Sequence, residues 1–351
     1  MIITSIFNPT LTRIVITSII LGFLAGSFGV FIVIKKQALV GDSLAHAALP
    51  GVVLAYMIFD TKSLEILLLG AAASAVVSMI ILNIIKKYSK IKSDATLALI
   101  LSGMFGLGIV LKHILQQSGG VGAAGVSTFI YGETASILLK DMYIIIGVFL
   151  FVNLLIALFW KEIKLSTFNP EFFNTIGFNS KIVDGLFSIL IVIVVVSGIQ
   201  MVGVVLISAI LIAPAVAARQ WSHRLSINFI VAGIIGALSG FTGALIGDYF
   251  ILPAGPTIIL VLSSVVLISL LFSPIKGVII KAILDFRYKK NIDNYKYLIN
   301  LYYEKKCNPT EEKVKTFLEE GFIYQSKNQM VLTDKGISKV KSIIKDDQVW
   351  V

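Results

Sequence analysis

Long apolar runs separated by short lysine clusters make up the first three quarters of the chain. About 20 apolar residues, rising ~1.5 Å each, cross the hydrocarbon core of a bilayer as a helix. The run over residues 182–218 predicts two helices with a turn at 197–200, the second of them rather short. Other runs of this kind lie at residues 14–34, 38–60, 64–85, 93–111, 142–160 and 236–272. The pattern predicts an all-α polytopic membrane protein of eight or nine transmembrane helices, the number depending on residues 112–140.

The apolar pattern ends near Pro274, and the density of charge rises after it. Residues 276–351 hold 15 of the 30 Lys and Arg residues and 10 of the 20 Asp and Glu residues. We therefore expect a transmembrane domain in residues 1–275 and a small α+β domain in residues 276–351. An apolar helix end at Phe317, a turn at Gly321, two short strands and a further helix are expected in the second domain. This order resembles the wing and following helix of winged-helix domains, which implies a regulatory or dimer-stabilising module.

Composition narrows the class of protein and its surroundings. With 57% hydrophobic residues, 14% charged residues and a mean hydropathy of +0.92, the chain is too apolar for a soluble domain of this size. The net charge of +10 arises largely from lysines that flank the spans, as the positive-inside rule expects, so nucleic acid is not expected as a partner. The rule predicts a multi-pass protein of the cell (inner or plasma) membrane with a cytoplasmic C-terminus. A single cysteine, Cys307, excludes an internal disulfide and a cysteine-based zinc site.

The segment 38–56 carries two ionisable residues, Asp42 and His46, within otherwise apolar material. A charged group costs about 2.5–3.5 kcal/mol at the centre of a spanning helix, so such residues usually face a bundle interior or a water-filled path. Four residues apart, they lie on one helix face. A carboxylate and an imidazole together suit Mn²⁺, Zn²⁺ or Fe²⁺, and Pro50 removes the donor for the carbonyl of His46. The spacing alone fits a metal path and a purely structural Asp–His hydrogen bond equally well.

The twelve residues GDSLAHAALPGV, 41–52, resemble the motif of the membrane-spanning permease subunit of ABC importers for manganese, zinc or iron. The resemblance implies that Asp42 and His46 line the metal path. It implies a divalent metal ion as substrate, with Mn²⁺ the first choice, and no permanently bound cofactor. It also implies four partners: a separate cytoplasmic ATPase, an extracellular or periplasmic metal-binding protein, a second copy of the chain, and membrane lipid.

A second stretch, GVVLISAILIAPAVAARQ at residues 203–220, resembles the same family. By that resemblance Pro214 starts a turn, and 215–224 form a short coupling helix whose Arg219, His223 and Arg224 face the ATPase. An ordinary basic loop after a span is the alternative. Asp248 lies near the end of a later span, where the family often has its acid nearer the following proline. We expect Asp248 to be an interfacial residue rather than a metal ligand.

The chain contains no glycine followed by lysine, so the phosphate-binding loop of ATPases is absent. The chain is therefore not expected to be an enzyme, and the energy for transport must come from a partner or a gradient. The alternative to an ABC permease is a proton-coupled secondary transporter of divalent cations. In that case Asp42 and His46 would exchange protons for the metal ion.

Overall fold

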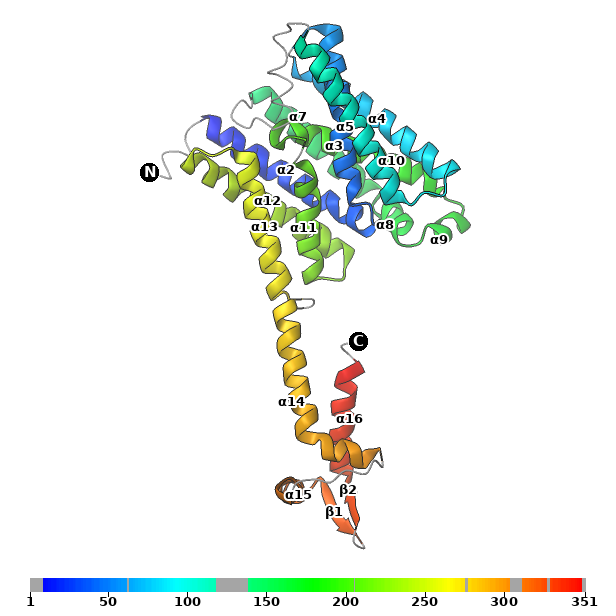
Figure 1. Cartoon of the computed structure of the whole chain (residues 1–351), viewed down its shortest axis with the longest axis vertical. Helices are drawn as coiled ribbons and strands as arrows, with labels where there is room; N and C mark the ends of the chain where they lie inside the picture. The colour runs from blue at the N-terminus through cyan, green and yellow to red at the C-terminus, as the bar shows by residue number, and fades with distance from the viewer. Residues whose placement is uncertain are drawn as a thin grey trace. The chain divides into compact units, whose positions relative to one another are not determined.

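The computed structural model describes residues 9–61, 63–117, 138–204, 206–274, 277–303, 311–326 and 329–348. The chain divides into two compact units, Met1–Ile275 and Lys276–Val351. The first is a bundle of helices, and the second contains helices and one small sheet (Figure 1).

Eight helices in the described part of the first unit are long and apolar enough to cross a membrane. This agrees with the predicted polytopic helical architecture. A ninth apolar helix, α11, has only 15 residues, and two short helices, α8 and α9, follow α7. The predicted ambiguity over residues 112–140 falls mostly on 118–137, which lie outside the described residues. The helices are α2 (Pro9–Ile34), α3 (Leu39–Phe59), α4 (Leu64–Tyr88), α5 (Ser93–Gln117), α7 (Leu139–Leu158), α8 (Trp160–Phe168), α9 (Pro170–Thr175), α10 (Ser180–Val202), α11 (Ile207–Trp221), α12 (Leu225–Phe250) and α13 (Ala254–Phe272).

Glycines bring α2 and α12 into backbone contact. A Cβ built on Gly236 would lie 2.0 Å from the carbonyl oxygen of Gly22, and one on Gly22 would lie 2.3 Å from the carbonyl oxygen of Gly236. One turn further along α12, a Cβ on Gly240 would lie 2.4 Å from the carbonyl oxygen of Ser18. Small residues permit such close packing in membranes, where apolar burial alone gives little drive for helices to associate. The GxxxG spacing from Gly236 to Gly240 therefore marks a helix interface between α12 and α2.

Two predicted turns are wrong. The chain does not turn at residues 197–200, because α10 continues to Val202 and Ser197 donates its hydroxyl within the helix to the carbonyl of Val194 (2.9 Å). The break comes instead after Val202, where Gly203 has a φ of 87°. Pro214 does not start a turn either, since it is buried inside the continuous helix α11. A proline is compatible with a membrane helix when neighbouring helices satisfy the freed backbone groups.

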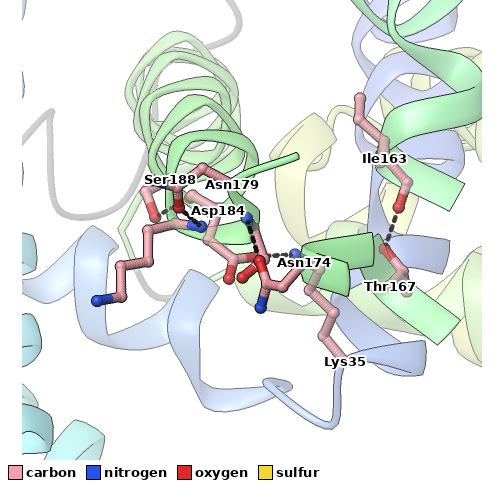
Figure 2. Close-up of polar contacts among 9 residues, drawn as sticks. Lys35, Ile163, Thr167, Asn174, Asn179, Asp184 and Ser188 are labelled. Carbon is pink, nitrogen blue, oxygen red and sulfur yellow. Dashed lines mark hydrogen bonds and ion pairs between the residues drawn. The ribbon is translucent and has the colours of Figure 1, made fainter. Parts of the chain in front are cut away.

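The connection from α7 to α10 contains the short helices α8 and α9. The side chain of Asn169 caps α9 by accepting from the backbone N–H of Phe172 (3.0 Å). Figure 2 shows how the link is tied to α10, with the side-chain oxygen of Asn174 accepting from the backbone N–H of Ser180 (2.9 Å). Lys35, just after α2, forms an ion pair with Asp184 of α10 (2.6 Å). The Asn174 contact orders the turn between α9 and α10, and the ion pair joins the end of α2 to α10.

Aromatic rings join three helix ends around Trp160, the first residue of α8. Its ring packs edge-on against Phe31 of α2 and Phe229 of α12, with centroids 5.8 and 5.4 Å apart. The end of α2, the start of α8 and the start of α12 therefore lie at one end of the bundle, which also carries Lys35.

The second unit follows the helix, hairpin, helix order expected from the sequence. It consists of α14 (Val278–Tyr302), α15 (Glu311–Glu319), β1 (Ile323–Ser326), β2 (Gln329–Leu332) and α16 (Asp334–Gln348). The strands are antiparallel, with Ile323 opposite Leu332. Phe322 and the Thr333 side chain link the hairpin to α16, and Gly336 allows the close approach because a Cβ there would lie 2.2 Å from the carbonyl oxygen of Phe322. The buried core comprises Tyr297, Leu298, Phe317, Phe322, Ile323 and Val340.

Candidate metal site

Asp42 and His46 lie in the first two turns of α3. Their spacing of four residues puts them on one face of the helix, and Nε2 of His46 is 3.5 Å from Oδ1 of Asp42. The pairing that the sequence predicts is therefore present. Helix α3 runs unbroken through Pro50, so the proline does not end the helix that carries the pair.

The pair is partly open. The side chain of Asp42 is 29% exposed and that of His46 is 14% exposed. The imidazole packs edge-on against the ring of Phe105 of α5, with centroids 4.8 Å apart. Its Nδ1 is buried and has no hydrogen-bond partner among the described residues. In a neutral imidazole one nitrogen carries the proton and the other a free lone pair, so only one of the two can bind a metal ion.

Buried hydroxyl groups hold α3 against its two neighbouring helices. Ser43, next to Asp42, donates to the carbonyl of Leu97 of α5 (2.9 Å), and Ser74 of α4 donates to the carbonyl of Ala47 (2.6 Å). Ser43 is 1% exposed. These bonds fix the rotation of α3 about its own axis, and this rotation decides where Asp42 and His46 point.

The small residues around Asp42 and His46 pack mainly against other helices of the same chain. A Cβ on Gly51 would lie 2.0 Å from the carbonyl oxygen of Gly70, so α3 and α4 touch there. A Cβ on Gly41 would lie 2.9 Å from the Leu211 side chain of α11, and Ala45, Ala47 and Ala48 are fully buried. The small residues near Asp42 and His46 therefore allow α4 and α11 of the same chain to approach α3 closely.

The sequence interpretation missed the open face of α5 beside the site. Gly103 and Gly106 are exposed, and a Cβ on either would meet no atom within 4 Å. They lie about 160° and 100° around α5 from Phe105, the residue that packs against the imidazole of His46. The sequence signal was the spacing of these glycines within an apolar span. That signal alone does not separate a glycine packed inside the chain, such as Gly108 against Leu49, from one left open.

The residues predicted to face an ATPase divide into two groups. Pro214 is buried within α11 and cannot be part of an exposed surface in this structure. Arg219 is half-buried in the last turn of α11, whereas His223 and Arg224 are exposed in the link to α12. Asp248 is exposed in the last turn of α12.

Within the described ranges, no group of three or more His, Cys, Asp or Glu side chains converges to hold a metal ion. Asp42 and His46 therefore supply two donors from one chain, fewer than the three or four protein ligands of stable zinc sites. Two donors on a partly open helix face suit an ion that binds briefly and leaves. A bundle of apolar helices with such a pair has the character of a multi-pass membrane transport protein.

Comparison with known proteins places the chain in a family. The model of the ABC 3 transport family matches residues 8–273. The zinc transport system membrane protein TroC of Treponema pallidum (strain Nichols) is 40% identical over 271 residues, which cover 77% of this chain and 91% of TroC. The manganese transport system membrane protein MntC of Bacillus subtilis (strain 168) is 36% identical over 301 residues, covering 85% of this chain and 69% of MntC.

A solved structure shares the fold. PsaBC from Streptococcus pneumoniae in complex with Fab contains a chain that superposes with a TM-score of 0.70 at 30% identity, covering 78% of this chain and 96% of that one. The chain belongs to the ABC 3 transport family, as the motif at residues 41–52 suggested, and it is a multi-pass membrane protein.

Proposed function

We propose that this chain is the permease subunit of an ABC importer that moves a divalent transition metal ion into the cytoplasm past Asp42 and His46. The pairing of these two side chains on a partly open face of α3 is the observation that carries the proposal. The relatives named above are zinc and manganese transport proteins, which supports a metal ion of this kind as substrate. Mn²⁺ is the first choice, because a site with a carboxylate and no thiolate suits the harder ion, with Zn²⁺ and Fe²⁺ next.

The ligand set is completed by a second copy of the chain. One chain offers two donors, whereas two copies related by a twofold axis would offer two carboxylates and two imidazoles. The open glycines of α5, Gly103 and Gly106, lie on the helix that contacts His46 and provide a surface where a second helix could approach closely. The metal path would then lie between the copies.

The test is metal uptake by cells that contain the complete importer, with Asp42→Ala and His46→Ala in this chain. Each variant should lose at least about tenfold of the uptake rate, because removal of one donor leaves too few ligands for the ion. His113→Ala is the matched control, since His113 lies at the far end of α5 and bonds only Gln117 among the described side chains. Uptake that is retained in both site variants, at equal amounts of folded protein, would refute the site. Asp248→Asn should retain uptake if Asp248 is interfacial.

The energy source separates this proposal from proton-coupled transport. An ABC permease loses uptake when its ATPase partner carries an inactivating substitution, even with the proton gradient intact. A secondary transporter loses uptake when the gradient is collapsed at constant ATP. Uptake that followed the gradient and ignored the ATPase would favour the alternative.

The ATPase is expected to dock at the end of the bundle where α2 ends and α8 and α12 begin. His223 and Arg224 are exposed there. The α8–α9 link adds an apolar surface, with Phe168, Phe172, Ile176 and Phe178 each between 46% and 58% exposed. Exposed apolar clusters mark interaction sites, and aromatic residues often dominate their energetics. This surface completes the docking site inferred from the sequence, in which Pro214 has no exposed role.

Co-purification of the ATPase with variants of this chain tests the docking site. Phe172→Ala with Ile176→Ala should reduce the ATPase recovered more than Arg224→Gln, because truncation of apolar anchors costs more than removal of an exposed charge. Equal recovery with all variants would place the docking site elsewhere.

We also propose that the C-terminal unit is a cytoplasmic winged-helix-like module with a regulatory or dimer-stabilising role. Its order of helix, hairpin and helix and its separate core support this. Truncation after Phe272 should leave metal transport measurable while changing its regulation or the dimer content. A truncated chain that matches the full chain in both would remove this role.

A further inference from the structure

The first half of α14 presents large apolar side chains outside the core of its unit. Val278 is 61% exposed, Ile283 is 48% exposed and Phe286 is 71% exposed. Among the described residues, α14 contributes to the core of the C-terminal unit only from Tyr295 onward. At 100° per residue, Val278, Ala282 and Phe286 lie on one face of the helix. An exposed apolar strip of this size on a helix requires a partner.

Basic side chains accompany the apolar strip. Lys281, Arg287 and Lys289 are all exposed. Around the helix, Lys281 lies about 60° to one side of Val278 and Arg287 lies about 100° beyond Phe286, so both border the apolar strip. Lys289 follows the strip one turn after Phe286, where the apolar stem of a lysine can cover it while the charge reaches the headgroups. Large apolar side chains bordered by lysine and arginine are typical of segments that lie in the interface of a bilayer. The positive charges are then attracted to anionic headgroups, each contributing roughly a fivefold gain in surface affinity.

The chain connection keeps this helix close to a bilayer. Helix α14 begins six residues after Phe272, the last residue of the membrane helix α13. Five linking residues extend at most about 18 Å. Ser273 and Gly277 have extended backbone, with ψ values of 137° and 131°, so α13 ends and α14 begins as a separate helix. The membrane surface is thus within reach of α14 in every copy of the protein.

We propose that residues 278–289 of α14 form a membrane-surface helix that binds anionic lipid headgroups where α13 leaves the bilayer. The apolar strip of Val278, Ala282 and Phe286 enters the interface, while the neighbouring lysines and arginine bind the headgroups. This surface is separate from the transport site and does not depend on the proposed function. It anchors the C-terminal unit to the lipid through a second, composition-sensitive contact.

A fluorescent probe on the full-length chain in nanodiscs tests the proposal. Ala282→Cys, with the native Cys307→Ser, places a bimane label on the apolar strip without removing a large side chain. Its emission should shift to shorter wavelength in nanodiscs containing phosphatidylglycerol and much less in phosphatidylcholine alone. The same label at Leu318→Cys on α15, a partly exposed residue of the C-terminal unit, is the control and should not shift.

Two variants separate the contribution of the charged side chains to lipid binding from that of the apolar strip. Lys281→Gln, Arg287→Gln and Lys289→Gln together should abolish the lipid-dependent shift, with a loss of surface affinity of about fivefold for each charge removed. Phe286→Ser should weaken the shift in both lipids.

Two results would overturn the proposal. The first is a probe that reports water in phosphatidylglycerol nanodiscs. The second is a shift of equal size in both lipids, together with disulfide cross-linking of two copies when the Ala282→Cys variant is left unlabelled and oxidised. That second result would assign the apolar strip to a contact between copies of the chain.

Discussion

Two sets of glycines in the same bundle have opposite surroundings. Gly22 and Gly236 bring the backbones of α2 and α12 together, and neither position has room for a Cβ. Gly103 and Gly106 of α5 have nothing within 4 Å of such a Cβ. The same residue type thus closes one helix interface and leaves another surface open. A glycine in a membrane helix is therefore understood only once its neighbours are known, because its role is set by what approaches it.

A substitution that disrupts the interface between α2 and α12 should give the largest effect on stability. Gly236→Ala places a methyl group 2.0 Å from the carbonyl oxygen of Gly22, so α2 and α12 must separate. Overpacking of this kind costs about 1–3 kcal/mol or more. We expect a clear fall in melting temperature and in the yield of monodisperse protein in detergent. Gly106→Ala is the matched control and should leave both unchanged or slightly improved, because alanine favours helix. Equal loss in the two variants would contradict the contrast between the interfaces.

A substitution on the open face of α5 should change transport more than stability. Gly106→Leu adds a side chain where a single chain has free space, so the melting temperature of the monomer should change little. If a second copy packs on this face, dimer formation and metal uptake should each fall by about tenfold or more, as close helix approach requires small residues. Gly147→Leu on α7 is the control, since a Cβ there also meets nothing within 4 Å. Normal dimer content in Gly106→Leu would place the second copy elsewhere.

The smallest effect should come from the hydroxyl that orients the site. Ser43→Ala removes the bond to the carbonyl of Leu97, and such bonds in membranes contribute on average about 0.6 kcal/mol. Stability should therefore fall slightly. Metal uptake should fall by a larger factor than stability, because rotation of α3 moves Asp42 and His46 together. Ser78→Ala is the control, since the Ser78 hydroxyl bonds the carbonyl of Ser74 within α4 itself. Unchanged metal uptake by the Ser43→Ala variant would show that packing alone sets the orientation.

Hydrophobic runs and spacing were sufficient to predict the helical bundle and the pairing of Asp42 with His46. Both depend on local periodicity, which the sequence carries directly. The predicted turns at 197–200 and at Pro214 failed for a tertiary reason. Gly198 accommodates the side chain of Ile207 across a helix contact, and buried Pro214 lies against Gly26 of α2. Inside membrane helices, residues that form turns elsewhere can serve packing, and only the neighbouring helix distinguishes the two roles.

The open face of α5 and the helical link of α8 and α9 also escaped the sequence. In both cases the property that matters is exposure, since little else in the described part of the chain packs against these residues. Phe172 and Ile176 resemble ordinary core residues in a list of apolar positions, yet they are exposed. Exposure depends on the arrangement of distant segments, and a single sequence does not contain that arrangement in any local pattern.

The break between α10 and α11 has a consequence for the surrounding lipid. Helix α11 has 15 residues and at ~1.5 Å per residue is about 22 Å long, shorter than a hydrocarbon core of roughly 30 Å. Helix α11 alone is therefore too short to span that core. Val202, Val204 and Ile207 are almost completely buried, so protein and not lipid surrounds the irregular backbone. The chain can therefore interrupt the helix between α10 and α11 without presenting polar backbone groups to acyl chains.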